Sequence, residues 1–314
     1  MPEDIWARSL IYLGIRRDKA MKNTKVSKRK LRLLREKREK AEGLKGGLNL
    51  KITVGKDGLS RLEDESGTVF LSKTSDKAID RDYFLRYVYC HYALCKTPPA
   101  KYTTCNQHRD NLNNLPCGKE AQALLKTIMP VKKGDTVVEA GAFQGFGTIY
   151  LSQTVGKEGL VVAIEGDANN YEMLCRNLEV NNIKNVIPIH AAVWDCDKML
   201  PFYSTGSQRR SLVESLLKYN SSEAVQARTI DGILDDLGIE NIDFLSLEVN
   251  SAEAAALRGL KKRLSSKHPM RVVSAGWYKD NDGVLGADAV SSELKKHSFV
   301  THLGVRKRVY GYRR

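Results

Sequence analysis

The stretch that decides the fold is TVVEAGAFQGFGT, residues 136–148. An apolar strand is expected over Thr136–Ala140, and it runs through Gly141 and Gly145 into an expected helix over Gly147–Val155. A strand, a glycine turn and a helix in this order are typical of a unit of a parallel sheet, in which the first helical N–H groups face the crevice beyond the strand. A glycine-rich turn alone is equally typical of a purely structural turn, so the residues that follow have to decide.

A second acidic strand end strengthens the first motif. The next expected strand, Val161–Glu165, again ends in an acid. Its distance from the glycine turn, roughly 20 to 25 residues, suits one strand–helix–strand unit. A carboxylate at this place can accept hydrogen bonds from both hydroxyls of a ribose. Together the two motifs indicate a nucleoside-containing ligand in the crevice.

The rest of the chain from Gly118 alternates helical patterns with short apolar strands, which predicts a parallel sheet covered on both faces. The fold class expected is α/β, with a doubly wound (Rossmann-like), mostly parallel seven-stranded sheet that ends in an antiparallel hairpin. Further strands are expected at Val186–His190, Phe244–Val249, Arg271–Ala275, Val300–Val305 and Arg308–Tyr312. Helices are expected at Lys119–Ile128, Asn169–Asn181, Ile230–Leu237, Ala252–Leu264 and Gly286–His297.

Composition changes along the chain predict three parts. Residues 1–46 form a basic, partly helical arm, residues 47–117 a small β-meander with a helix, and residues 118–314 the main domain. The meander is expected from strands at Leu50–Val54, Leu59–Leu62 and Thr68–Leu71, which are separated by Gly-Asp-type turns, and its helix from the near-helical spacing of aromatic residues over Arg81–Leu94.

Positive charge is concentrated in the arm. Residues 16–40 hold 13 Lys and Arg against three acids, a surplus of ten within a formal net charge of +14. Such a run suits the phosphates of RNA or DNA or an anionic membrane surface, and it equally suits an exposed, solvated helix without a partner. The basic residues near the end of the chain, which could extend the same positive face, are Arg306, Lys307, Arg308, Arg313 and Arg314.

No stretch approaches the roughly 20 apolar residues of a membrane-spanning helix, and no secretory signal is expected at the start of the chain. The expected location is therefore the cytoplasm, with peripheral attachment to an anionic surface as an alternative. The oligomeric state cannot be read from the sequence. No metal site is predicted, because the spacing of Cys90, Cys95, Cys105 and Cys117 matches no common zinc motif.

Four blocks of sequence, in the right order, resemble the class I S-adenosylmethionine-dependent methyltransferases and, within them, the FkbM family. The blocks are VVEAGAFQGFGTIYLS, VVAIEGDANNYEMLCRNLEVNN, VIPIHAAVWD and RTIDGILDDLGIENIDFLSLEVNSAEAAALRGL. The last block resembles the family's paired threonine–aspartate–helix and aspartate–phenylalanine–strand signature. The resemblance covers about Leu115 to Val305 and implies S-adenosylmethionine as cofactor and methyl transfer as activity, on an acceptor that the sequence does not identify.

Carried over residue by residue, the resemblance implies two sets of functional residues. In the cofactor set, Glu139, Gly141 and Gly145 would shape the methionine end, Glu165 would hold the ribose, and residues 194–195 would lie near the adenine. That set consists of Glu139, Gly141, Ala142, Phe143, Gly145, Thr148, Glu165, Gly166, Asn169, Ala192, Trp194 and Asp195. The catalytic set, which would face the methyl group and its acceptor, consists of Glu248, Asn250 and Glu253.

The acceptor-side residues leave the mechanism open. A hydroxyl acceptor benefits from a base, for which Glu248 is the candidate, and contact of Glu248 with the cofactor alone is an equal alternative. Asn250 and Ser251 stand where the family commonly has glutamate and glycine. The leading hypothesis is O-methylation of a small molecule, sugar or lipid-linked acceptor. An RNA-modifying enzyme that uses the basic arm and a non-catalytic cofactor-binding module are the alternatives.

Overall fold

The computed structural model describes residues 51–54, 59–63, 67–73, 119–204, 210–212, 221–276, 278–279, 283–304 and 307–314. The chain divides into two compact units, Met1–Leu48 and Asn49–Arg314. The expected basic arm, the expected helix Arg81–Leu94 and the four cysteines at 90, 95, 105 and 117 lie outside the described residues.

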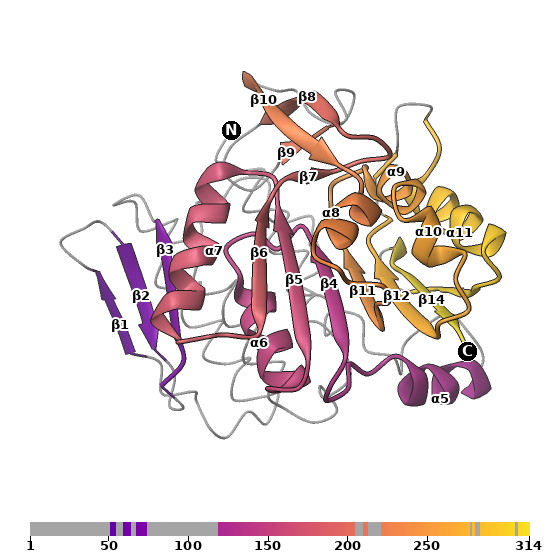
Figure 1. Cartoon of the computed structure of the whole chain (residues 1–314), viewed down its shortest axis with the longest axis horizontal. Helices are drawn as coiled ribbons and strands as arrows, with labels where there is room; N and C mark the ends of the chain where they lie inside the picture. The colour runs from indigo at the N-terminus through magenta and orange to yellow at the C-terminus, as the bar shows by residue number, and fades with distance from the viewer. Residues whose placement is uncertain are drawn as a thin grey trace, which may run out of the picture. The chain divides into compact units, whose positions relative to one another are not determined.

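A mixed sheet forms the centre of the second unit. Its strands are β4 (Thr136–Ala140), β5 (Leu160–Glu165), β6 (Val186–His190), β11 (Phe244–Leu247), β12 (Met270–Ser274), β13 (Val300–Leu303) and β14 (Val309–Arg313). They lie in the order β13-β14-β12-β11-β4-β5-β6 (Figure 1). The five strands from β12 to β6 run parallel, and β14 pairs antiparallel with β12 and β13. The predicted seven-stranded, mostly parallel sheet with a closing hairpin is confirmed.

Helices cover both faces of the sheet. They are α5 (Lys119–Ile128), α6 (Phe146–Val155), α7 (Ala168–Val180), α8 (Ile230–Asp236), α9 (Glu253–Arg258), α10 (Lys261–Leu264) and α11 (Gly286–Lys296). Val137 packs in the cluster with α5 and α6, whereas the next residue, Val138, packs in the cluster with α8 to α11. Because successive side chains of a strand point to opposite faces, strands buried on both sides need the continuous apolar runs seen here.

The single helix expected over Ala252–Leu264 is in fact two short helices, α9 and α10. The chain turns at Gly259, where a Cβ atom would lie 2.1 Å from the backbone oxygen of Trp194. The Gly259 carbonyl oxygen also accepts a hydrogen bond of 2.9 Å from the N–H of Asp231. The backbone at Trp194 therefore approaches Gly259 closely where the first helix ends. Helical periodicity in the sequence does not reveal such a contact.

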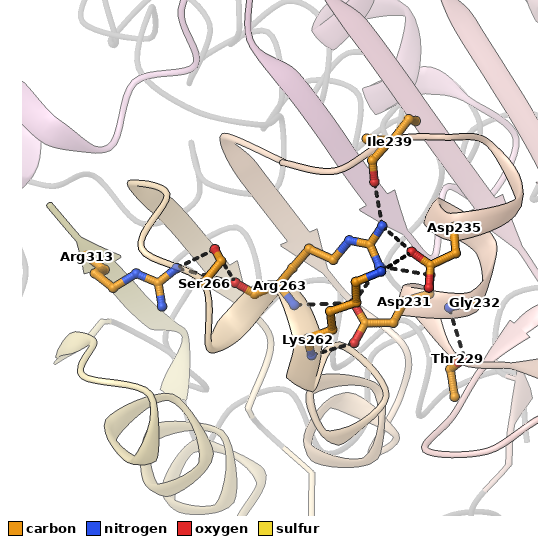
Figure 2. A network of polar contacts seen from close by, with 9 residues as sticks. All are labelled: Thr229, Asp231, Gly232, Asp235, Ile239, Lys262, Arg263, Ser266 and Arg313. Carbon is orange, nitrogen blue, oxygen red and sulfur yellow. Dashed lines mark hydrogen bonds and ion pairs between the residues drawn. The ribbon is translucent and has the colours of Figure 1, made fainter.

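A buried arginine joins α8 to α10 (Figure 2). Arg263, only 2% exposed, pairs with Asp231 at 3.1 Å and with Asp235 at 2.6 Å, and it donates to the carbonyl oxygen of Ile239 at 2.5 Å. Asp231 also accepts the N–H of Lys262 at 2.6 Å, at the start of α10. Thr229 caps α8 by accepting the N–H of residue 232 at 3.1 Å. The threonine–aspartate signature is thus a structural clamp between two helices.

A second sheet, which the sequence reasoning missed, follows β6. Its strands are β7 (Ala192–Val193), β8 (Lys198–Ser204), β9 (Arg210–Ser211) and β10 (Ser221–Arg228), in the order β7-β10-β8-β9. β10 pairs parallel with β7 and antiparallel with β8. Figure 1 shows this sheet beyond one end of β4 to β6. Ser211 of β9 donates a hydrogen bond of 2.6 Å to the carbonyl oxygen of Asn250, in the loop after β11.

The predicted β-meander is present as a three-stranded antiparallel sheet. Its strands are β1 (Lys51–Val54), β2 (Leu59–Glu63) and β3 (Val69–Lys73), in the order β1-β2-β3. Strand β3 lies beside α7 (Figure 1). The meander is therefore attached to the helix that follows β5.

Candidate active site

The acidic residues expected at the site meet at the carboxyl ends of three neighbouring strands. β4, β5 and β11 are adjacent in the sheet, and Glu139, Glu165 and Glu248 lie at or just beyond their ends. The three carboxyl groups are close enough that Glu165 and Glu248 both raise the pKa of Glu139. The structure thus brings together side chains that are up to 109 positions apart in the sequence.

The turn after β4 adopts a left-handed backbone conformation that favours glycine. Gly141 and Gly145 have φ values of 86° and 84°, and Phe143 between them has a φ of 54°. A Cβ atom on Gly141 would lie 2.2 Å from the carbonyl oxygen of Glu248, and one on Gly145 would lie 2.6 Å from Leu174. These glycines therefore serve close packing of the turn against the loop after β11 and against α7, in addition to a left-handed backbone.

Glu165 links the two motifs. One of its carboxylate oxygens accepts the N–H of Phe143 at 2.8 Å, and the other accepts the N–H of Asp167 at 2.8 Å. The side chain is buried, and burial raises its pKa to about 7 against the lowering effect of these hydrogen bonds. Asp167 in turn caps α7 by accepting the N–H of Asn170 at 2.8 Å.

Glu139 is held by the helix that follows it. The hydroxyl of Thr148, on α6, donates a hydrogen bond of 2.6 Å to its carboxyl group. Burial raises the pKa of Glu139 to about 8, with smaller contributions from the nearby Glu248 and Glu165. At neutral pH this carboxyl group is therefore mostly protonated unless a cation binds near it.

The loop after β11 carries Glu248 and Asn250 of the expected catalytic set, and the third residue, Glu253, is the first of α9. Glu248 is 24% exposed, and its Oε2 has no hydrogen-bond partner among the described residues. Asn250 and Ser251 have φ values of 50° and 82°, so two consecutive residues adopt a left-handed backbone. Glu253 is buried and accepts the N–H of Val249 at 3.0 Å, and burial raises its pKa to about 7. Glu253 therefore stabilises the loop through its hydrogen bond to the backbone of Val249.

Arg308 is a residue of this site that the sequence reasoning placed elsewhere. The sequence places it among the basic residues that could extend the positive face of the arm, yet it is 3% exposed and its guanidinium lies 3.9 Å from Glu248 Oε2. Arg313, from the same tail, donates to the carbonyl oxygen of His268 at 2.9 Å and lies over the ring of Phe299 at 4.7 Å. No local pattern distinguishes the buried Arg308 and the half-buried Arg313 from their exposed neighbours, because their burial depends on contacts with distant parts of the chain.

The remaining residues of the expected cofactor set lie along the edge beside β5. A Cβ atom on Gly166 would lie 3.3 Å from Ala192, so these two residues are packed together. Trp194 is partly buried, and Asp195 forms an ion pair of 3.1 Å with Arg258 of α9. The three other residues of the set lie in the turn or on the helices, where Ala142 is buried, Thr148 contacts Glu139 and Asn169 is exposed.

Nothing else in the described part of the chain suggests another kind of centre. Within those residues no group of three or more His, Cys, Asp and Glu side chains could hold a metal ion. The helices described there are also too short or too polar to cross a membrane.

The acidic corner formed by Glu139, Glu165, Glu248 and Glu253 suits a cationic ligand that contains a nucleoside. Four carboxyl groups gather there, three of them with a raised pKa, and Arg308 is the one cation that an ion pair links to them among the described residues. The Oε1 atom of Gln144, within the turn, is buried without a hydrogen-bond partner in the described structure. Such uncompensated acids and acceptors are stabilised by a positive charge and by hydroxyl or amino donors.

A family model described as "Methyltransferase FkbM domain" matches residues 139–313, from the acid at the end of β4 to the last strand. The chain belongs to the FkbM methyltransferase family. A model for protein-L-isoaspartate O-methyltransferase also matches residues 75–195 of this FkbM methyltransferase. The predictions of a class I methyltransferase and of S-adenosylmethionine as its methyl donor are confirmed.

Individual relatives of this FkbM methyltransferase are distant. A protein-L-isoaspartate O-methyltransferase of Thermotoga maritima is 28% identical over 127 residues, which are 40% of this chain and only 37% of the relative's length. A methyltransferase structure from Aquifex aeolicus is 17% identical and covers 61% of this chain and 86% of its own, with a TM-score of 0.36. Fibrillarin from Aeropyrum pernix, solved with S-adenosylmethionine, is 12% identical and covers 85% and 99%, with a TM-score of 0.39.

Proposed function

We propose that this enzyme methylates an oxygen atom of a small-molecule, sugar or lipid-linked acceptor, and that Glu248 removes the proton of that oxygen. The observation that carries the proposal is the position of Glu248. Its backbone oxygen packs against Gly141 of the cofactor turn, and its side chain is 24% exposed, whereas Glu139, Glu165 and Glu253 are buried. Its Oε2 atom is buried and lies 3.9 Å from Arg308, so the exposed part of the carboxyl group is the part that an acceptor can reach. Glu248 is thus the acid of the corner that remains available to an acceptor.

The other carboxyl groups have fixed partners that suit binding roles. Glu139 is bonded to Thr148, Glu165 to two backbone N–H groups, and Glu253 to the N–H of Val249. We assign Glu165 to the ribose, Glu139 to the methionine end and Glu253 to support of the loop. Gly166, Ala192, Trp194 and Asp195 would border the adenine.

S-adenosylmethionine supplies a methyl carbon that is activated by a positively charged sulfur. When bound, the cofactor would transfer this carbon to the acceptor oxygen, and the electron pair of the carbon–sulfur bond would stay on sulfur. The proton of the acceptor hydroxyl passes to a carboxylate oxygen of Glu248. The main task of the protein is to align the two reactants. The turn after β4 and the loop after β11, which Glu253 holds through the N–H of Val249, contribute to this alignment. Arg308, 3.9 Å from Glu248, balances the negative charge of the base.

Substitution of Glu248 by glutamine tests this assignment. Glutamine keeps the size of the side chain and cannot accept the proton as a base, so methyl transfer from radiolabelled S-adenosylmethionine to a panel of hydroxylated acceptors should fall by about 100-fold or more. Affinity for S-adenosylhomocysteine, measured by calorimetry, should change little. Glu158→Gln, at an exposed position before β5, is the matched control. Unchanged transfer by the Glu248 variant would contradict the role as base.

The same calorimetry addresses cofactor binding and the non-catalytic alternative. Glu165→Gln places an amide N–H₂ against a backbone N–H, and it should weaken S-adenosylhomocysteine binding by about 1–3 kcal/mol. Absence of binding by the wild-type protein would remove the proposed site. Binding by the wild type without transfer to any acceptor of the panel would favour a cofactor-binding module.

A second candidate is an RNA methyltransferase, which the surplus of ten positive charges in residues 16–40 favours. A variant in which the Lys and Arg residues of that segment are replaced by Gln and Ser should then retain less labelled RNA on a filter. The salt dependence of RNA binding should also be weaker, because fewer counterions are released. Equal retention by both proteins would count against this function.

A further inference from the structure

Asn177 of α7 and Asn181, which caps the C-terminus of that helix, bind the backbone of β3 as a neighbouring strand would. The side-chain amide of Asn177 accepts the N–H of Leu71 at 2.6 Å and donates to the Leu71 carbonyl oxygen at 2.9 Å. One helical turn later, Asn181 accepts the N–H of Val69 at 2.8 Å and donates to the Val69 carbonyl oxygen at 2.6 Å. Each amide therefore satisfies both backbone groups of one strand residue, and the edge of β3 is bound to the helix.

Asn177 makes one contact that Asn181 does not. Its Nδ2 also donates a hydrogen bond of 2.8 Å to the carbonyl oxygen of Gln144, which lies in the cofactor turn between Phe143 and Gly145. Asn177 is completely buried, so water cannot replace this bond. Both hydrogens of its amide are used, one toward β3 and one toward the turn.

The polar contacts continue from the turn to the second cofactor motif. The side chain of Gln144 donates to Asn170 at 3.4 Å, and the N–H of Asn170 donates to Asp167 at 2.8 Å. The N–H of Asp167 donates to Glu165 at 2.8 Å. A continuous path of hydrogen bonds thus runs from the backbone of β3 to the carboxylate assigned to the ribose.

Aromatic side chains also connect β3 to the turn after β4. Phe70, between the two residues that the asparagines hold, is fully buried, and its ring lies 5.6 Å from that of Phe146 at the start of α6. The ring of Phe146 lies 6.0 Å from that of Phe143. Phe143 has a positive φ of 54°, a conformation that a non-glycine residue keeps only when its surroundings hold it. The meander supplies part of those surroundings.

We propose that Asn177 is a positioning residue that couples the β-meander to the cofactor turn, so that docking of the meander and binding of the cofactor strengthen each other. The coupling is reciprocal, because two events that stabilise the same arrangement of Gln144 must favour each other by the same factor. The inference rests on the proposed role of the turn and of Glu165 in holding the cofactor.

Asn181 provides the control, since it holds the same strand without touching the turn. Its one further hydrogen bond among the described residues, of 2.7 Å, goes to the carbonyl oxygen of Asn177. Calorimetry with S-adenosylhomocysteine should show binding about tenfold weaker for Asn177→Ala, which corresponds to about 1.4 kcal/mol. For Asn181→Ala the affinity should stay within about twofold of the wild type. Equal weakening by both substitutions would mean that Asn177 acts only by holding β3, and it would overturn the proposal.

Hydrogen exchange on the wild-type protein gives a second readout that needs no variant to fold. Saturating S-adenosylhomocysteine should slow exchange of the Leu71 N–H by about tenfold, although Leu71 lies outside the proposed cofactor site. In Asn181→Ala, which leaves the acceptor of the Leu71 N–H in place, this protection should persist. Unchanged exchange of Leu71 in the wild type would overturn the coupling.

Glu165→Gln separates this inference from the function on which it rests. If that variant binds S-adenosylhomocysteine as well as the wild type, the proposed cofactor site itself is wrong. If it binds weakly while Asn177→Ala binds normally, the site stands and the coupling through Asn177 is wrong. Weak binding by both, with normal binding by Asn181→Ala, supports the coupling.

Discussion

Replacing Glu139 by glutamine should change how cofactor affinity depends on pH. The Glu139 carboxyl group is buried, accepts a hydrogen bond of 2.6 Å from Thr148, and has a pKa raised from 4.5 to about 8, chiefly by burial. A rise of this size corresponds to a preference for the protonated form on the order of 5 kcal/mol. At pH 7 about nine-tenths of the cofactor-free molecules therefore hold this proton.

The sign follows from the charge of the ligand. The positive sulfur of S-adenosylmethionine favours an ionised Glu139, so binding releases a proton and affinity should rise with pH. The rise should be up to about tenfold per unit below pH 8 and should level off above it. Glu165 and Glu253, whose pKa values are both raised to about 7, add to the slope near neutrality.

Folding stability without cofactor should depend on pH in the opposite sense. The folded protein holds the Glu139 proton more tightly than the unfolded chain does, since the folded pKa is the higher one. The resulting contribution to the free energy of unfolding is fully present below about pH 4.5 and is lost as the pH rises through 8. Denaturant unfolding at pH 5, 7 and 9, compared between wild type and Glu139→Gln, measures it.

Calorimetry at pH 6 to 9, in buffers with different ionisation enthalpies, counts the protons released on binding. Glu139→Gln should release about one proton fewer than the wild type near pH 7. S-adenosylhomocysteine, whose sulfur is neutral, should show a shallower pH dependence than S-adenosylmethionine. Affinity that falls as the pH rises, or equal proton release by the wild type and the variant, would refute the reasoning.

Three further substitutions, with Lys262→Met as a control, probe the backbone and the clamp between helices. Gly141→Ala, at a φ of 86° and with its Cβ 2.2 Å from a carbonyl oxygen, should lower the free energy of unfolding by about 2–4 kcal/mol and abolish detectable cofactor binding in calorimetry. Ser251→Gly, at a φ of 82°, should raise the free energy of unfolding by about 0.5–1 kcal/mol. A lower free energy of unfolding, measured with denaturant, would show that the backbone at this residue is not strained. Arg263→Met should cost about 3–5 kcal/mol by leaving Asp231 without its buried partner, with unchanged affinity for S-adenosylhomocysteine, whereas the exposed Lys262→Met should cost under about 1 kcal/mol.

The central sheet could be predicted because its strands are buried on both faces. Runs such as Val161–Glu165 and Phe244–Leu247 have to be almost wholly apolar, and such runs are visible without tertiary information. The four-stranded sheet was missed because its strands are partly exposed. Strand β10 is rich in Ser, Glu and Gln, and β8 contains Pro201, so neither shows the alternation on which strand prediction depends.

Some residues of the candidate site could likewise be placed from the sequence, and others could not. The acids at the ends of β4 and β5 could be placed from the sequence, since a strand end fixes the position of its last side chain. The burial of Arg308 beside Glu248 could not, because it depends on contacts with distant parts of the chain. The same holds for the link from Asn177 to Gln144, which lies 33 positions earlier in the chain.

The clamp formed by Thr229, Asp231 and Arg263 has a consequence for how relatives are recognised. The threonine–aspartate part of the block that resembles the family's signature maintains the junction of two helices rather than the chemistry at the end of β11. A relative could therefore keep the clamp and lose methyl transfer, or lose the clamp and keep the reaction through another contact. On the proposed role of Glu248, the activity of a homologue is to be judged at the corresponding position, whereas the clamp indicates only the architecture.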